Sequence, residues 1–294
     1  MQPTTEEQLI TLHLAGVAPR VIATALKIST AQVNATVAEW QAKTAQKAKE
    51  LLTRDVKTPL TIQASDWMVT SDWHVPFTDW GLFEKMVMIA EKHLRRPRRL
   101  VCAGDLFNMD AFSNFQHVTL PANWSEERSS AKELLSYCLG VFDEIYLLTG
   151  NHDARLMKWS QGQLESDDIF GMVLTNTKVL SSRFAYMTAQ TCNGLWRFTH
   201  PEGYRQGRTV LAQTLADDLQ MNVISGHEHH TGVTASKTGR YVACNIGGLY
   251  KPEHLDYVMR ADRIRPHMTP GFAMLRDGYV DVFGDPLTRW EAWV

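Results

Sequence analysis

The chain has 294 residues, of which 44% are hydrophobic, so it is long enough for one large domain with a substantial core and a small additional one. Its formal net charge of −2 excludes a bulk attraction to nucleic acid, so any such binding needs a local basic patch. The four cysteines lack Cys-x-x-Cys spacing, which argues against a zinc ribbon or a disulfide framework. No apolar run is long enough for a membrane span, and the first residues lack the features of a signal peptide. We therefore expect a cytoplasmic protein with no membrane partner.

The first 58 residues predict a small all-α domain followed by a linker. Three short helices are expected between residues 4 and 48, with Pro19 opening the second and Ser29 or Thr30 capping the third. The spacing of apolar residues in the second and third helices resembles a helix-turn-helix. Few cations accompany these helices, although contacts between cations and phosphates normally dominate affinity for DNA. The segment therefore predicts either a DNA-binding unit or a helical module that docks on the rest of the chain or forms a homo-oligomer.

The remainder of the chain, residues 59–294, has the pattern of predicted strands and helices that is typical of an α/β domain. Apolar runs predict buried strands at Trp67–Thr70, Leu100–Ala103, Ile145–Leu148 and Val223–Ile224. Helical periodicity predicts helices over residues 79–94, 124–139 and 207–219, the second of them capped by Ser125. Short strands are then expected over residues 241–245, 272–275 and 279–283, with a hairpin turn at Asp277-Gly278.

Metal-binding side chains follow apolar runs of this domain in a fixed order. The segments are Asp72-Trp-His74, Gly104-Asp105, Gly150-Asn151-His152-Asp153, Thr199-His200 and Gly226-His227-Glu228-His229. Because residues just past the ends of several strands converge on one edge of a sheet, we expect these side chains to meet. Each segment alone also fits a structural role, such as a surface pair, a turn or a helix cap. Together, carboxylate, imidazole and amide ligands from five loops are what two neighbouring divalent cations require.

In these segments the chain resembles the calcineurin-like metallophosphoesterase superfamily, from about residue 64 onward. The resemblance implies an α/β fold in which a four-layer, two-sheet sandwich is flanked by helices, so that residues 59–294 form the metallophosphoesterase domain. It also implies two metal sites that share Asp105 as a bridge. Their other ligands are Asp72, His74 and His229 for one ion and Asn151, His200 and His227 for the other. His152 matches the catalytic histidine of the family, which gives a proton or hydrogen bond to the leaving oxygen.

The donor set predicts the kind of metal and the kind of reaction. Oxygen and nitrogen donors without cysteine suit manganese, with iron, zinc, nickel and magnesium as alternatives. A binuclear-metal-dependent phosphoesterase is therefore predicted, which hydrolyses phosphodiester or phosphomonoester bonds. Two alternatives are a general phosphomonoesterase or protein phosphatase, and an adaptor that binds DNA or protein and keeps a vestigial site. The complete ligand set argues against the adaptor.

One segment departs from the pattern of the protein Ser/Thr phosphatases in this superfamily. Their second block continues to Asp-Arg-Gly, in which the Asp orients the catalytic histidine and the Arg grips phosphate. Here Asn108 and Met109 stand at those two positions, and Asp110 lies two residues further along, a shift of several Å in extended backbone. The residues of the motifs are more similar to those of the DNA-repair nucleases and phage-encoded members of the superfamily. We therefore favour a nucleic acid or a nucleotide as substrate.

Other residues near these motifs are candidates for substrate contact or for orienting the ligands. Arg155 has a spacing that aims its guanidinium back over the metals, and Arg205 and Arg208 follow His200 in a turn-rich loop. Asp153 is a nearby carboxylate that can fix the tautomer of a histidine, so we place it with His152 and Arg155 in the catalytic group. The loop over residues 107–123 is expected to form a wall or lid over the site.

Overall fold

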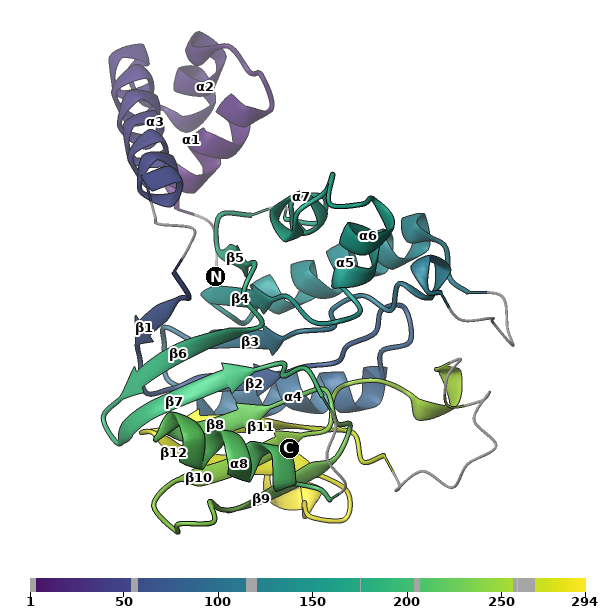
Figure 1. Ribbon diagram of the computed structural model, residues 1–294. Coiled ribbons are helices and arrows are strands. Elements are labelled where there is room, and N and C mark those ends of the chain that lie inside the picture. The colour runs from purple at the N-terminus through teal and green to yellow at the C-terminus, as the bar shows by residue number, and fades with distance from the viewer. Residues whose placement is uncertain are drawn as a thin grey trace. The chain divides into compact units, whose positions relative to one another are not determined.

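The computed structural model describes residues 4–53, 58–114, 121–174, 176–203, 207–255, 258 and 268–294 (Figure 1). Arg205 and part of the predicted lid, residues 115–120, lie outside these described residues. The chain divides into two compact units, Met1–Thr58 and Pro59–Val294. All four cysteines are free thiols, as their spacing predicts. Among the helices that the structure describes, none combines the length and apolar character needed to cross a bilayer.

The first unit is made of the three helices expected from the sequence. They are α1 (Thr5–Leu14), α2 (Pro19–Leu26) and α3 (Thr30–Thr53). The Ser29 hydroxyl accepts a hydrogen bond from the backbone N–H of Gln32 at 3.1 Å, so Ser29 caps the start of α3. Leu9, Ile22 and Val33, one from each helix, form the small buried core.

The second unit contains two six-stranded mixed sheets. The first has the order β12-β11-β2-β3-β4-β5, with β2 to β5 parallel. Its strands are β2 (Trp67–Thr70), β3 (Arg99–Ala103), β4 (Glu144–Leu148), β5 (Val179–Ser182), β11 (Gly271–Arg276) and β12 (Tyr279–Gly284). The second has the order β1-β6-β7-β8-β10-β9. Its strands are β1 (Thr61–Gln63), β6 (Tyr186–Thr191), β7 (Gly194–Thr199), β8 (Asn222–Ser225), β9 (Thr231–Ala235) and β10 (Val242–Ile246).

The alternation of side chains along β2 shows how the layers are built. Trp67 and Val69 belong to the core between the two sheets, where Phe198 of β7 also lies, whereas Met68 points to the helices on the outer face of the first sheet. Those helices are α4 (Trp80–His93), α5 (Trp124–Leu139), α6 (Ala154–Trp159) and α7 (Ser166–Gly171). Helix α8 (Val210–Leu219) covers the other sheet through Ala216. The four-layer sandwich expected from the resemblance is therefore confirmed (Figure 1).

The start of α5 corrects one expectation from the sequence. Asn123, not Ser125, caps this helix, because its side chain accepts from the N–H of Glu126 at 3.1 Å. The Glu126 carboxylate accepts in return from the N–H of Asn123 at 2.9 Å. This reciprocal capping box begins the helix at Trp124 and leaves Ser125 inside the first turn.

Candidate metal centre

The ends of five strands bring the predicted ligands to one place. Strands β2, β3 and β4 are parallel neighbours, so the residues that follow them lie at the same edge of the first sheet. Strands β7 and β8, also parallel, end in the second sheet just before the remaining ligands. In chain order these residues are Asp72 and His74 after β2, Asp105 after β3, Asn151 after β4, His200 after β7, and His227 and His229 after β8.

Asp72, His74 and His229 form the first cluster of potential ligands. The Nε2 atom of His229 lies 3.0 Å from Oδ1 of Asp72 and 3.4 Å from Nε2 of His74. The Nε2 atom of His74 is 3.8 Å from the same carboxylate oxygen. All three side chains are buried, and one ligand atom from each lies within 4.8 Å of the others. A single cation can therefore contact all three.

Asp105, His200 and His227 form a second cluster with the same spacing limit of 4.8 Å. The Nε2 atom of His200 is 3.3 Å from Oδ2 of Asp105 and 2.9 Å from the amide oxygen of Asn151. A third group of atoms, from His74, Asp105 and His152, joins the two clusters. Asp105 therefore lies between the two clusters. The structure thus brings together all seven predicted ligands.

The backbone at these ligands is held in an unusual conformation. Ten non-glycine residues in the described part of the chain have positive φ, and five of them are predicted ligands. These five are Asp72, His74, Asp105, His227 and His229, with φ between 44° and 77°. Residues with side chains seldom adopt this left-handed region, and such strain of about 1–3 kcal/mol each is found mainly at functional sites. The fold therefore stores strain at this cluster.

Two glycines leave room for the ligands. A Cβ atom on Gly150 would overlap Oδ1 and the backbone nitrogen of Asp105. A Cβ atom on Gly226 would overlap the side chains of Ser71 and Asp72. Glycine is needed at both positions because the chain passes directly against a carboxylate.

The electrostatics of the buried cluster favour a bound cation. Burial alone would lower the pKa of His200, but the charges of Asp105 and Asp72 outweigh it and raise that pKa to about 10. Burial alone would raise the pKa of Asp105, yet His200 and His152 hold it below its ordinary range. Both effects mean that the carboxylates create a strongly negative potential at this point. The residues present therefore fit divalent cations, which would occupy the same field.

Asp153 lies beneath the loops that carry the ligands. Its Oδ2 atom accepts from the backbone N–H groups of Asp105 and Gly150, both at 2.9 Å, and its Oδ1 atom accepts from Phe107 at 3.1 Å. The side chain is 1% exposed. Asp153 thus ties the loop after β3 to the loop after β4.

His152 and Arg155 form a hydrogen-bonded pair with the segment after Asp105. The Nδ1 atom of His152 lies 2.6 Å from the carbonyl oxygen of Asn108, and its Nε2 atom lies 2.9 Å from Nη2 of Arg155. Arg155 also donates from Nη1 to this carbonyl at 3.0 Å and to Oδ1 of Asp110 at 2.6 Å. The Asp110 carboxylate is therefore a direct partner of Arg155. Arg208, in contrast, is exposed in the turn before α8.

Glu127 is a buried carboxyl group that the sequence analysis did not single out. It accepts from the backbone N–H of Asn108 at 3.1 Å and from that of Met109 at 2.9 Å. It therefore fixes the segment whose carbonyl contacts His152, and Met109 in this segment has a φ of 50°. The sequence does indicate that Glu127 is buried, because Glu127 occupies the same face of α5 as the buried residues Ala131 and Leu135.

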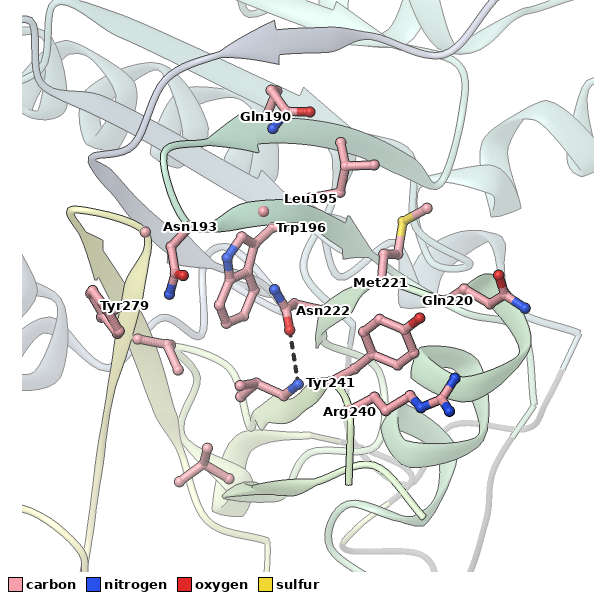
Figure 2. Close-up of a pocket in the computed structure, with 15 residues that line it drawn as sticks. Gln190, Asn193, Leu195, Trp196, Gln220, Met221, Asn222, Arg240, Tyr241 and Tyr279 are labelled. Carbon is pink, nitrogen blue, oxygen red and sulfur yellow. Dashed lines mark hydrogen bonds between the residues drawn. The ribbon is translucent and has the colours of Figure 1, made fainter. Parts of the chain in front are cut away.

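A pocket of about 840 Å³ lies away from this centre (Figure 2). It is lined by Trp196, Tyr241 and Tyr279 among others, and Asn222 accepts there from the N–H of Val242 at 2.9 Å. Asn222 is the first residue of β8, whereas His227 follows the last. The pocket is therefore at the opposite end of the strand, and none of the predicted ligands lines it.

The family model for calcineurin-like phosphoesterases matches residues 67–291, about three quarters of the chain. The chain belongs to the calcineurin-like phosphoesterase family. The match begins at β2 and spans all five loops of the metal centre. Calcineurin-like phosphoesterases act on phosphate esters, so a hydrolase of such esters is supported by the family and by the cluster of histidines and aspartates together.

Solved structures of low identity resemble the chain, and a search of curated proteins gave no match. A single-residue mutant of Vps29 from Entamoeba histolytica is 13% identical, with 74% of this chain and 97% of that one covered and a TM-score of 0.38. A hypothetical protein from Pyrococcus horikoshii is 9% identical, with coverage of 74% and 87% and a TM-score of 0.45. Vps29 from Chaetomium thermophilum is 11% identical, with coverage of 75% and 97% and a TM-score of 0.40.

Proposed function

We propose that this chain is a two-metal phosphoesterase whose substrates are nucleic acids or nucleotides. The observation that carries the proposal is the position of Asp105, which shares one cluster with His74 and another with His200. One buried carboxylate between two sets of nitrogen and oxygen donors is the arrangement that a pair of divalent cations needs. Manganese is the favoured ion, with iron, zinc, nickel and magnesium as alternatives.

The chemistry divides between the cations and the side chains around them. When bound, two such cations act as Lewis acids toward phosphoryl oxygens and make a nucleophile available from water at neutral pH. Asp105 is held for this role by the backbone N–H of His152, which donates to its Oδ1 atom at 2.8 Å. Asp153 holds the backbone on both sides of the bridge, so we assign it to positioning rather than to contact with the substrate.

His152 and Arg155 are the groups proposed to contact the leaving oxygen. A carbonyl oxygen only accepts, so Nδ1 of His152 carries the hydrogen that faces Asn108. Burial lowers the pKa of His152 well below its usual value, although Asp105 opposes this. The neutral ring therefore has an unprotonated Nε2, which accepts from Arg155. While His152 is neutral, Arg155 is the group that donates to an incoming phosphate oxygen. His152 donates a hydrogen bond from Nε2 only when its ring is doubly protonated.

The segment after Asp105 favours a nucleic acid or nucleotide over a phosphoprotein. In the protein phosphatases of this family an Arg of this segment grips phosphate, whereas Met109 stands at that position here and is fully buried. The Asn108 side chain turns to Asp110, to which its amide nitrogen donates at 2.8 Å. Neither residue offers a cation to the phosphate, whereas Arg155 on α6 lies beside the cluster, in contact with His152.

Hydrolysis of simple esters tests the proposal. We would measure turnover of an aryl phosphate monoester, its bis-aryl diester, and single- and double-stranded DNA, with Mn²⁺ and after chelation. We expect turnover of the diester and of DNA that chelation abolishes and His152→Ala lowers by at least 100-fold. His254→Ala, at an exposed histidine outside the clusters, should retain full activity. No turnover of any ester with any of the candidate metals would favour the adaptor instead.

We propose that the first unit, residues 1–58, is a separate module that joins two copies of the chain. Leu14 of α1 and Val21 of α2 are 66% and 57% exposed, so both apolar side chains are available to a second copy. Lys43, one of its few cations, is paired with Glu39 at 2.7 Å, which reduces the positive charge that Lys43 can offer to a DNA phosphate. Light scattering on the full chain should show a dimer that Leu14→Glu dissociates. A monomer that binds duplex DNA in gel shifts would contradict this assignment.

A further inference from the structure

A pocket of about 330 Å³ opens beside the proposed metal centre. Asn151 lines this pocket and also contacts His200 at 2.9 Å, so the pocket and the cluster share a residue. Arg155, which contacts His152, lines it as well. The pocket therefore adjoins the cluster, within reach of a group that neighbours a phosphate bound there.

One face of α6 supplies most of the wall. Arg155, Lys158 and Trp159 are spaced i, i+3 and i+4, which places them on the same side of a helix. Trp159 is 67% exposed, and its ring meets that of Phe112 edge-on with centroids 5.5 Å apart. An indole fixed by a neighbouring ring and exposed to water is a surface on which a planar aromatic group can stack.

The charge of the pocket has one sign. Among the described residues that line it, the charged ones are Arg155 and Lys158, both cations. Arg155 is already hydrogen-bonded to Asp110, whereas Lys158 is an exposed residue at the end of α6. The pocket therefore combines an aromatic platform with a cation that suits a second phosphate. A nucleotide unit carries both groups, a planar base and a phosphate.

We propose that this pocket binds one nucleotide unit of the substrate, with its base on Trp159 and its flanking phosphate near Lys158. This inference rests on the proposed phosphoesterase function and names the part of the substrate that the enzyme recognises. The volume of about 330 Å³ lies at the lower end of the range for small-molecule sites, which fits one nucleotide rather than two. Stacking on an aromatic ring accepts every base, so little sequence preference is expected.

Two esters with one leaving group isolate the effect of the base. Thymidine 5′-(p-nitrophenyl phosphate) and methyl p-nitrophenyl phosphate are both phosphodiesters with p-nitrophenol as the leaving group. Only the first carries a nucleoside. Trp159→Ala should raise KM for the thymidine ester roughly tenfold and leave the methyl ester unchanged, with Trp159→Phe in between. Trp80→Ala, at an exposed tryptophan on α4 that does not line the pocket, is the matched control. Equal effects of Trp159→Ala on both esters, or none on either, would overturn the proposal.

A binding measurement tests the pocket independently of turnover. Calorimetry on the full chain with Mn²⁺ should show tighter binding of AMP than of ribose 5-phosphate, and Trp159→Ala should remove most of that difference. If the wild type hydrolyses neither ester but prefers AMP in this way, the proposed function fails and the pocket assignment stands. Equal affinity for AMP and ribose 5-phosphate would overturn the assignment. A further comparison separates a nucleic acid strand from a free nucleotide as the source of the bound nucleotide unit. Tighter binding of a short oligothymidylate than of TMP, with this difference in affinity lost in Lys158→Gln, would identify the strand.

Discussion

The Nδ1 atom of His152 lies 2.6 Å from the backbone carbonyl oxygen of Asn108. In the protein phosphatases of this family a side-chain carboxylate at the position of Asn108 orients the catalytic histidine. Here the backbone carbonyl at the same position contacts His152 instead, and Glu127 holds this stretch of main chain through the N–H groups of Asn108 and Met109. A neutral carbonyl orients the ring without adding negative charge, so it raises the basicity of His152 less than a carboxylate would.

The shared position of Asp105 predicts an unequal loss of metal in two variants. Asp105→Asn removes a carboxylate that shares one group of ligand atoms with His74 and another with His200 and His227, whereas His74→Asn alters a residue that shares no group with His200 or His227. Elemental analysis after gel filtration should find less than one ion per chain in Asp105→Asn and about one in His74→Asn. Equal metal content in the two variants would contradict the bridging position.

The Asp153 carboxylate should contribute to stability even without metal. Asparagine offers one oxygen where the carboxylate offers two, so Asp153→Asn leaves at least one of three buried N–H groups without an acceptor. Urea unfolding in chelator should show a loss of roughly 1–3 kcal/mol. Asp218→Asn, at an exposed position on α8, should stay within about 0.5 kcal/mol of the wild type. A similarly small change in Asp153→Asn would show that these hydrogen bonds are dispensable.

A methyl group at Gly150 should disable the centre. The added Cβ of Gly150→Ala would overlap the side chain and backbone of Asp105, so the bridging carboxylate has to move. A displacement of about 1 Å at a reacting centre is enough to lower kcat/KM by roughly 100-fold. Gly171→Ala places its Cβ in open space at the end of α7 and should keep activity on the bis-aryl diester. Wild-type kcat/KM in Gly150→Ala would mean that the loop adjusts without cost.

Glu127 predicts a pH dependence of stability that does not involve the metal ligands. Burial, supported by the nearby charge of Asp110, raises its pKa from 4.5 to about 8, although the N–H groups of Met109 and Asn108 oppose this. A raised pKa in the folded state stabilises the protein fully below pH 4.5, and this contribution is lost as pH rises to about 8. The stability of the wild type relative to Glu127→Gln should therefore fall across this window, by at most about 1.4 kcal/mol per pH unit. Urea unfolding at a series of pH values measures it, and a constant difference would refute the raised pKa.

The strands that carry most of the ligands were predictable because they are apolar on both faces. Strands β2, β3 and β4 are almost entirely buried between helices and the second sheet, so each appears as a short apolar run. Strands β6 and β7 did not stand out, since residues such as Gln190 and Arg197 alternate with their buried residues. Arg197 stacks on Tyr186, with its guanidinium 3.9 Å from the ring centroid, and the sequence does not reveal that contact.

Details of the site that depend on backbone geometry could not be read from residue types. The order of carboxylates and histidines predicted which side chains meet. It did not predict that a carbonyl group faces His152, or that Arg155 turns to Asp110. Met109, between Asn108 and Asp110, has a left-handed conformation, and its N–H is held by Glu127 of α5. The place of Asp153 in the catalytic group stays a prediction, and residue types alone did not reveal that its carboxylate accepts from three backbone N–H groups.

The most direct test of the two-metal centre combines stoichiometry with activity in one titration. The chain would be stripped with chelator, titrated with Mn²⁺, and followed by elemental analysis and by turnover of bis-p-nitrophenyl phosphate. We predict that turnover is absent in the stripped chain, rises with added Mn²⁺ and saturates at two ions per chain, and that Asp105→Asn recovers neither binding nor turnover. Full turnover in the stripped chain, or turnover that saturates at one ion per chain or fewer, would contradict a two-metal phosphoesterase.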